Sequence, residues 1–337
     1  MVFLRWFLGL VLMGWVMVNC SGYQTIGSLI IPNEFFQIPT PTFLPTVSPS
    51  PSSTPIPPTP VPTLTKAQQW AGTVQSDLVY GVAEGVELKL DLHFPKTIGS
   101  RLLPAVLYVH GGSWVSGDKA GGYAEIAELV RRGYLVASVN YRLAPKWKFP
   151  AQIEDVKCAV RYLRAHAAEY HLDPNRIGAF GISAGGHLVA LLGTTDTSAG
   201  MEGNGGYAEY SSRVQAVVDA SGPTDFTLYG PKLHPRNKDV FGAASLDDPI
   251  IRRISPLTYV SKDDPPFLIL HGEKDDMVVL RHSENLVEKL QKEGVPARLV
   301  VVKNAGHGFN QPGVETSPTF TEVLILMGNF FDEHLKK

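Results

Sequence analysis

The pentapeptide Gly181-Ile182-Ser183-Ala184-Gly185 constrains the fold of this chain more than any other stretch. It lies between an apolar run and a run with helical character, so it predicts a strand, a sharp turn and a helix in direct succession. Ser183 at the apex must adopt a strained backbone conformation, and Gly181 and Gly185 are small enough to let strand and helix approach each other. A simple turn produces the same pattern, so its meaning depends on the rest of the chain.

The start of the chain differs from the rest in composition. Residues 1–20 carry one charged side chain, Arg5, followed by a nearly unbroken apolar run, which predicts an export signal. That run is shorter than the roughly 20 residues that span a bilayer. The sequence ending at Cys20 resembles the lipobox of bacterial lipoproteins, although Asn19 and Met17 depart from it. We therefore expect an exported protein, either extracellular or anchored to the membrane through a lipid on Cys20. The alternatives are an uncleaved N-terminal anchor or a signal that is cut elsewhere.

Residues 21–65 form a segment that is dominated by Pro, Thr and Ser from position 38 onward. Proline fixes a backbone dihedral and removes a donor, so this segment is predicted to be an extended linker or stalk. A disordered linker without a particular role is the alternative. The two cysteines, Cys20 and Cys158, imply no disulfide framework. Cys158 falls in an amphipathic helical pattern and is predicted to be a buried structural thiol.

Residues 66–337 are predicted to form one catalytic domain of the α/β class. The first strand expected, 86–92, alternates apolar residues with Glu87, Lys89 and Asp91, and is predicted to be half-buried. Short apolar runs then alternate with helical patterns. The runs are 105–109, 135–139, 176–180, 214–218, 267–270 and 299–302, and the helical patterns include 153–166, 284–292 and 321–334. Apolar strands separated by helices predict a mostly parallel central sheet with helices on both faces.

Candidate chemical groups follow several of these strands, where ligands bind in sheets of this kind. Directly after 105–109 comes His110-Gly111-Gly112-Ser113-Trp114. The backbone N–H groups of Gly111 and Gly112 can join that of Ala184 in binding an oxyanion, because glycine has no Cβ to block the approach. A tight glycine turn without such a role is the alternative.

Two further strand ends carry an acid and a histidine. Asp275 and Asp276 follow the strand 267–270, and His307 lies on a glycine-flanked loop after 299–302. A carboxylate in the first loop can hold the tautomer of a histidine that takes the proton of Ser183. The residues leave the choice between the two aspartates open, and Asp225 also follows a strand. The chain order Ser, Asp, His is the order of the α/β-hydrolase triad.

Together with Asn140-Tyr141-Arg142-Leu143-Ala144-Pro145, these motifs resemble those of bacterial α/β-hydrolase esterases over residues 75–335. The feruloyl and acetyl-xylan esterase-like enzymes and the relatives of hormone-sensitive lipase are the most similar kinds. The resemblance implies the α/β-hydrolase fold, with Ser183 as nucleophile, His307 as general base and Asp275, in preference to Asp276 or Asp225, as the orienting acid. It implies hydrolysis of carboxylic esters with short acyl groups or with acyl groups on plant polysaccharides. Trp114, with the segment 223–254, is expected to line the acyl pocket.

Other classes of function receive less support from the sequence. The net charge of -2 and the lack of a basic cluster do not indicate a nucleic-acid partner. The histidine spacings do not suggest a metal site, and no nucleotide-binding motif is present, so no cofactor is expected. His187 and His271 are predicted to be structural, as is a pair formed by Arg142 and Asp155. An amidase or peptidase, like arylformamidases or prolyl oligopeptidases, and a catalytically silent binding module remain as alternatives.

Overall fold

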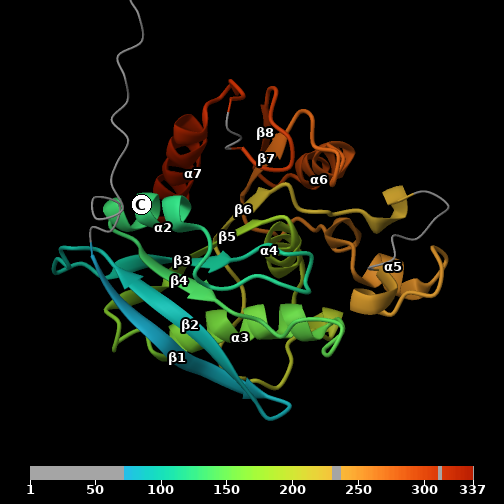
Figure 1. Cartoon of the computed structure of the whole chain (residues 1–337). Helices are drawn as coiled ribbons and strands as arrows, with labels where there is room; N and C mark the ends of the chain where they lie inside the picture. Colours follow the sequence, from blue (N-terminus) through green and yellow to red (C-terminus); the bar gives the residue numbers. More distant parts are fainter. Residues whose placement is uncertain (1–71, 230–236, 310–312, 337) are drawn as a thin grey trace, which may run out of the picture. The chain divides into compact units, whose positions relative to one another are not determined.

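An eight-stranded sheet with the order β1-β2-β4-β3-β5-β6-β7-β8 forms the centre of the fold (Figure 1). The computed structural model describes residues 72–229, 237–309 and 313–336, which belong to the unit Val61–Lys337. The strands are β1 Thr73–Ala83, β2 Val86–Phe94, β3 Leu103–Val109, β4 Leu135–Val139, β5 Leu172–Ile182, β6 Ala216–Ala220, β7 Phe267–Gly272 and β8 Ala297–Val302. The export signal, lipid anchor and linker predicted for residues 1–65 lie outside the described residues.

The helices are α2 Tyr123–Arg131, α3 Ala151–Ala165, α4 Ala184–Thr194, α5 Pro249–Arg253, α6 Arg281–Lys292 and α7 Phe320–Leu335. Short helical turns lie at η1 Thr197–Ala199, η2 Phe226–Tyr229, η3 Asn237–Phe241 and η4 Pro256–Thr258. None of the helices among the described residues is long and apolar enough to cross a membrane.

The strands from β3 to β8 run parallel to one another, whereas β1 and β2 are antiparallel to their neighbours. Every residue of β3 is buried. Its side chains alternate between two core clusters, with Leu107 and Val109 in one and Val106 and Tyr108 in the other. The first cluster contains α3, α4 and α6 residues and the second contains α2 and α7 residues, so helices cover both faces of the sheet (Figure 1). The predicted α/β fold with a mostly parallel sheet is therefore confirmed.

The first two strands differ from expectation. The strand β1 was not predicted, and it joins β2 through a two-residue turn in which Glu84 and Gly85 both have positive φ, 49° and 76°. This is the turn geometry that suits the twist of a hairpin. The prediction that Asp91 lies on a solvent face of a half-buried strand was wrong. Asp91 is buried because the Lys119 ammonium lies 2.9 Å from its carboxylate and the backbone N–H of Asp77 donates to it over 2.8 Å.

Candidate active site

Ser183 lies at the junction between β5 and α4, where the sequence predicts a sharp turn. Its φ of 58° and ψ of -117° lie in a region that residues with a Cβ seldom adopt. A Cβ on Gly181 would lie 2.3 Å from the carbonyl oxygen of Gly185, and a Cβ on Gly185 would lie 2.0 Å from that of Val109. Both distances are far below van der Waals contact, so the two glycines are what allow β5, α4 and β3 to meet at Ser183.

The side chains of Ser183, His307 and Asp275 form one hydrogen-bonded chain. His307 Nε2 lies 2.8 Å from Ser183 Oγ, and His307 Nδ1 lies 2.8 Å from Asp275 Oδ2. Because a carboxylate only accepts, Nδ1 carries the proton and Nε2 is left to accept from the serine hydroxyl. The histidine is thus held in the tautomer that can take a proton from Ser183.

Asp275 is held as an anion beneath His307. Burial raises the pKa of its carboxyl, but hydrogen bonds from His271, His307 and the backbone N–H of Val278 outweigh burial, so the pKa lies well below its usual range. The backbone N–H groups of Met277 and Val278 donate to Oδ1 over 3.0 Å and 2.9 Å. The loop itself therefore fixes the orientation of this carboxylate.

The other two candidate acids lie elsewhere. Asp276 is exposed to solvent. Asp225 directly precedes the turn η2, and its Oδ1 accepts from the backbone N–H and the hydroxyl of Thr227 while its Oδ2 accepts from Asn285. Of the three aspartates that the sequence offered, Asp275 is the one that hydrogen-bonds to His307.

Of the three residues expected to supply an oxyanion site, Gly111 and Ala184 lie next to Ser183, and Gly112 follows Gly111 in the same loop. A Cβ on Gly111 would lie 2.9 Å from the carbonyl oxygen of Ile182 and 3.4 Å from Ser183 Cβ, so the main chain passes close to the serine. Gly112 has a φ of 115°, and a Cβ there would lie 2.1 Å from the carbonyl oxygen of Ser116. Ala184 is the first residue of α4, where backbone N–H groups have no partner within the helix. Such N–H groups are suited to stabilising negative charge.

Trp114, in the same loop as Gly111 and Gly112, is buried in an aromatic cluster. Its indole N–H donates to His187 Nδ1 over 3.1 Å, and its ring packs against Phe241 with centroids 4.8 Å apart and against Phe226 with centroids 6.1 Å apart. Phe226 and Phe241, both from the segment 223–254, therefore pack on Trp114, and the prediction that this segment and Trp114 line an acyl pocket stays a prediction. This cluster could not be predicted from local sequence, because its aromatic side chains come from segments far apart in the chain.

His187 and His271, which the sequence predicts to be structural, are both buried. In each ring, both nitrogens form hydrogen bonds. His187 donates from Nε2 to the carbonyl oxygen of Ile254 over 2.7 Å and accepts from Trp114. His271 donates from Nε2 to the carbonyl oxygen of Val278 over 2.8 Å, and its Nδ1 lies 2.7 Å from the hydroxyl of Ser283. Both rings hold loops in place around the site.

Tyr141 has a structural role beside His110 that the sequence analysis did not predict. Its ring stacks on the ring of His110 with centroids 4.3 Å apart, and its hydroxyl donates to the backbone carbonyl of His110 over 3.1 Å. His110 Nδ1 in turn donates to the carbonyl oxygen of Gly111 over 2.7 Å. Arg142, the next residue, forms the predicted ion pair with Asp155 at 2.8 Å. The motif around Asn140 thus supports the loop that approaches Ser183.

Two other predictions concern groups that do not belong to the site. Cys158 is buried, as predicted, and burial raises the pKa of its thiol to about 11. Within the described residues, no group of three or more His, Cys, Asp or Glu side chains is arranged to hold a metal ion.

The fold and these motifs can be compared with known proteins. The family model described as BD-FAE matches residues 90–290, which is more than half of the chain. The chain belongs to the BD-FAE family. The resemblance to α/β-hydrolase esterases is thereby confirmed, because the similar proteins described next are named as esterases or as a carboxylic ester hydrolase.

Three of these similar proteins illustrate the relationship. LipM of Mycobacterium tuberculosis, described as a probable carboxylic ester hydrolase, is 33% identical over 196 residues, which are 56% of this chain and 45% of LipM. A truncated carbohydrate esterase from gut microbiota has a TM-score of 0.69 and 31% identity, over 80% of this chain and 99% of that chain. The propionate-bound esterase Est2 of Thermogutta terrifontis has a TM-score of 0.67 and 26% identity, over 79% and 95%. The matched part of the chain spans 45% to 61% of the first curated relatives.

Proposed function

We propose that this BD-FAE protein hydrolyses carboxylic esters through Ser183, His307 and Asp275 and a covalent acyl-enzyme. The observation that carries the proposal is the hydrogen-bonded chain from Ser183 Oγ through the His307 ring to Asp275, with 2.8 Å at both steps. An isolated serine hydroxyl is a poor nucleophile, and an adjacent oriented base is what activates it. The names of the related esterases support the same chemistry.

The reaction follows from where the protons lie. His307 Nε2 accepts the hydroxyl proton as Ser183 Oγ attacks the ester carbonyl carbon, and the Asp275 carboxylate stabilises the imidazolium that results. The carbonyl oxygen, now negative, is stabilised by the backbone N–H groups of Gly111, Gly112 and Ala184. His307 then gives its proton to the departing alcohol, which leaves the acyl group on Ser183. A water molecule, activated by His307 in the same way, releases the acid.

We propose that the substrate is an ester with a short acyl group or an ester of an acyl group on a plant polysaccharide. The similarity to a carbohydrate esterase and to an esterase solved with propionate supports this choice. Trp114 is proposed to border the acyl group from within its aromatic cluster. An exported protein meets such a polymer outside the cell, and we propose that residues 1–20 direct export and that Cys20 anchors the chain by a lipid, with residues 21–65 as spacer.

Hydrolysis of p-nitrophenyl acetate by the full-length chain, with Ser183→Ala measured beside it, tests the activity. We expect hydrolysis that falls by up to about 10⁶-fold in the variant, because the triad acts as a unit. Mass spectrometry after rapid quenching of the parent should show one acyl group on the peptide that contains Ser183. Cleavage of p-nitroacetanilide in preference to the ester would favour an amidase. A folded parent that cleaves neither compound would favour the silent binding module.

A further inference from the structure

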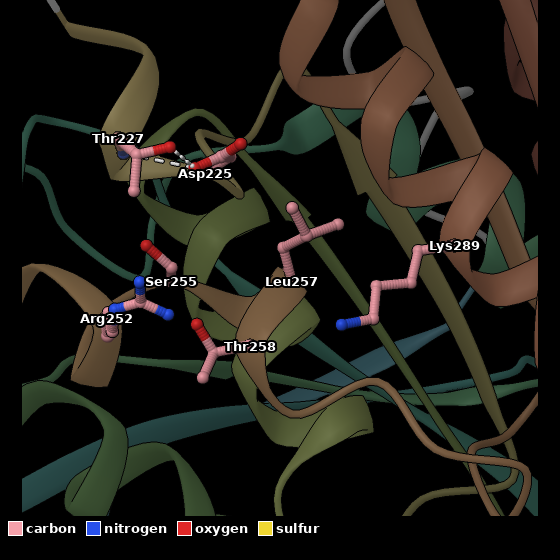
Figure 2. Close-up of a pocket in the computed structure, with 7 residues that line it drawn as sticks. All are labelled: Asp225, Thr227, Arg252, Ser255, Leu257, Thr258 and Lys289. Atoms are coloured by element: carbon pink, nitrogen blue, oxygen red, sulfur yellow. Dashed lines mark hydrogen bonds between the residues drawn. The ribbon is translucent and has the colours of Figure 1, made fainter.

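A cavity of about 340 Å³ lies beside the turn η2, which also carries Phe226 of the aromatic cluster (Figure 2). Its walls come from η2, from the segment that runs through α5 and η4, and from α6. The residues that line it are Asp225, Thr227, Arg252, Ser255, Leu257, Thr258 and Lys289. The volume falls in the range of about 300 to 1,000 Å³ that small-molecule sites occupy.

The cavity carries one more positive than negative charge. Arg252 and Lys289 line it, and in the part of the chain that the structure describes neither forms an ion pair. Figure 2 shows the Lys289 side chain extending from α6 toward Leu257 and Thr258. The one acid in the wall, Asp225, is buried and accepts hydrogen bonds from Thr227 and Asn285. Two cations that line the same cavity and have no ion-pair partner among the described residues are suited to a ligand that carries a negative charge.

The uncharged side chains in the wall of the cavity indicate which other groups a ligand would carry besides an anion. Thr227 and Thr258 add hydroxyl groups to the wall, and Leu257 adds an apolar surface. The hydroxyl of Thr227 donates to Asp225, so its own oxygen remains able to accept. A ligand with several hydroxyl groups, one carboxylate and an apolar ring face would satisfy all of these groups, and a sugar acid has this composition. A compact dianion such as phosphate suits the cavity less, because the Asp225 carboxylate would repel it.

The cavity is joined to the catalytic serine by a short chain of contacts. Ser255 in its wall follows Ile254, whose carbonyl oxygen accepts from His187 Nε2 over 2.7 Å. The backbone N–H of His187 donates in turn to the carbonyl oxygen of Ser183 over 2.9 Å. Ser183 immediately precedes α4 and His187 lies four residues later in its first turn, which corresponds to a rise of about 6 Å. A ligand that reaches from the ester at Ser183 to this cavity must therefore be larger than a simple ester.

We propose that this cavity is a subsite for a uronic acid residue of the saccharide that carries the ester. The proposal rests on the proposed ester hydrolysis and deepens it, because it adds an acidic sugar to the substrate. The Arg252 guanidinium and the Lys289 ammonium bind the carboxylate, while Thr227, Thr258 and Asp225 bind sugar hydroxyls. Binding energy gained at this distance from the reacting bond helps to position the ester at Ser183.

Binding is tested first, and separately from catalysis, with full-length Ser183→Ala protein in a calorimeter. The probes are an acetylated xylo-oligosaccharide with one glucuronic acid branch, the same compound with that branch reduced to glucose, and inorganic phosphate. We expect the acidic compound to bind about tenfold more tightly than the reduced one, since a charge-assisted hydrogen bond is worth about that much. Lys289→Gln and Arg252→Gln in the same background should each remove most of the difference. Equal binding of the two saccharides, or tighter binding of phosphate, would overturn the proposal.

Kinetics with active enzyme supply the second test. The readout is the ratio of kcat/KM for the acidic saccharide to that for the reduced one. We expect this ratio to fall about tenfold in Lys289→Gln and to keep its value in Lys292→Gln, an exposed lysine on the same helix that does not line the cavity. A ratio that does not change in Lys289→Gln, or that falls equally in Lys292→Gln, would contradict the subsite. A parent that binds the acidic saccharide but cleaves no ester would instead contradict the proposed function.

Discussion

The indole N–H of Trp114 donates to Nδ1 of His187 over 3.1 Å, and the two rings meet edge to face with centroids 5.2 Å apart. The bond joins the loop that follows β3 to the helix α4 that begins after Ser183. Both side chains are buried, so neither group can turn to water if the other is removed. The pair thus fixes the position of Gly111 and Gly112 relative to the nucleophile.

Trp114→Phe should lower the free energy of unfolding by about 1 to 3 kcal/mol, because it leaves Nδ1 of His187 buried without a donor. Urea unfolding followed by circular dichroism measures the change. The control is Trp147→Phe, in which a half-buried indole that carries the Lys146 ammonium over its ring is replaced, at a cost below about 1 kcal/mol. Equal effects at the two positions would mean that the bond to His187 contributes little.

A second substitution at position 114, Trp114→Ala, tests whether Trp114 borders the acyl group. We expect Trp114→Ala to shift the preference among p-nitrophenyl acetate, butyrate and octanoate toward the longer chains, because the space that the indole fills becomes available to the acyl group. The measurement is the ratio of kcat/KM values for the three esters. Unchanged ratios would remove Trp114 from the acyl pocket and leave it a purely structural residue.

His187 also makes stability depend on pH. Burial, together with the neighbouring His282, lowers its pKa from 6.5 to about 4 against the opposing hydrogen bond to Ile254. Protonation would place a second proton on Nδ1, facing the Trp114 donor. The folded pKa lies below the unfolded one, so the stabilising contribution is complete above pH 6.5 and is lost as the pH falls toward 4.

We therefore expect the stability difference between the parent and His187→Gln, which has no group to titrate at this position, to shrink by about 2 kcal/mol from pH 7 to pH 5. Urea unfolding of both proteins at each pH measures it. Burial raises the pKa of Asp155 and of Asp219 to about 6, which gives stability the opposite dependence on pH, but these groups are common to both proteins and cancel. A difference that stays constant with pH would show that His187 does not titrate as described.

Asp275→Asn and Asp276→Asn form a matched pair that tests the assignment of the acid. An amide at position 275 can donate to His307 Nδ1 and so favours the tautomer with its proton on Nε2, which cannot accept from Ser183. We expect kcat for p-nitrophenyl acetate to fall by about 10⁴-fold in Asp275→Asn. Asp276 is exposed and its change should alter kcat less than about twofold. The reverse result would assign the role to Asp276.

Much of the arrangement around Ser183 could be predicted, because it depends on local sequence. The glycines at 181 and 185, the loop at 110–114 and the strand-end position of His307 follow from short motifs and from the parallel order of the strands. The choice between Asp275 and Asp276 could not be derived in this way. Adjacent residues point in different directions, and only the bonds from Met277 and Val278 determine which carboxylate turns inward.

The errors concern contacts between residues far apart in the chain. Alternation predicted that Asp91 faces solvent, but Lys119, which is 28 residues later, reaches it and lets it be buried. Phe226 and Phe241 pack on Trp114 from a segment more than 100 residues away, and nothing in their local sequence marks them. The cavity lined by Arg252 and Lys289 has the same origin, since its walls come from three separate elements.

Gly185→Ala tests how closely the chain must pack at the elbow. The added Cβ would lie 2.0 Å from the carbonyl oxygen of Val109 and 2.7 Å from that of His110, both main-chain atoms of the neighbouring strand end. These atoms cannot move without displacing the loop that carries Gly111. We therefore expect a loss of about 3 kcal/mol or more in unfolding free energy, at the upper end of overpacking effects, together with a drop in kcat.

Gly99→Ala is the control, because no atom lies within 4 Å of its Cβ position. It should change stability by less than about 1 kcal/mol. Failure of Gly185→Ala to show a cooperative urea transition would agree with the steric argument, because the overlap then exceeds what the fold tolerates. A Gly185→Ala protein as stable as Gly99→Ala would mean that strand and helix have room to separate, and the glycine would then be required for the approach of substrate rather than for packing.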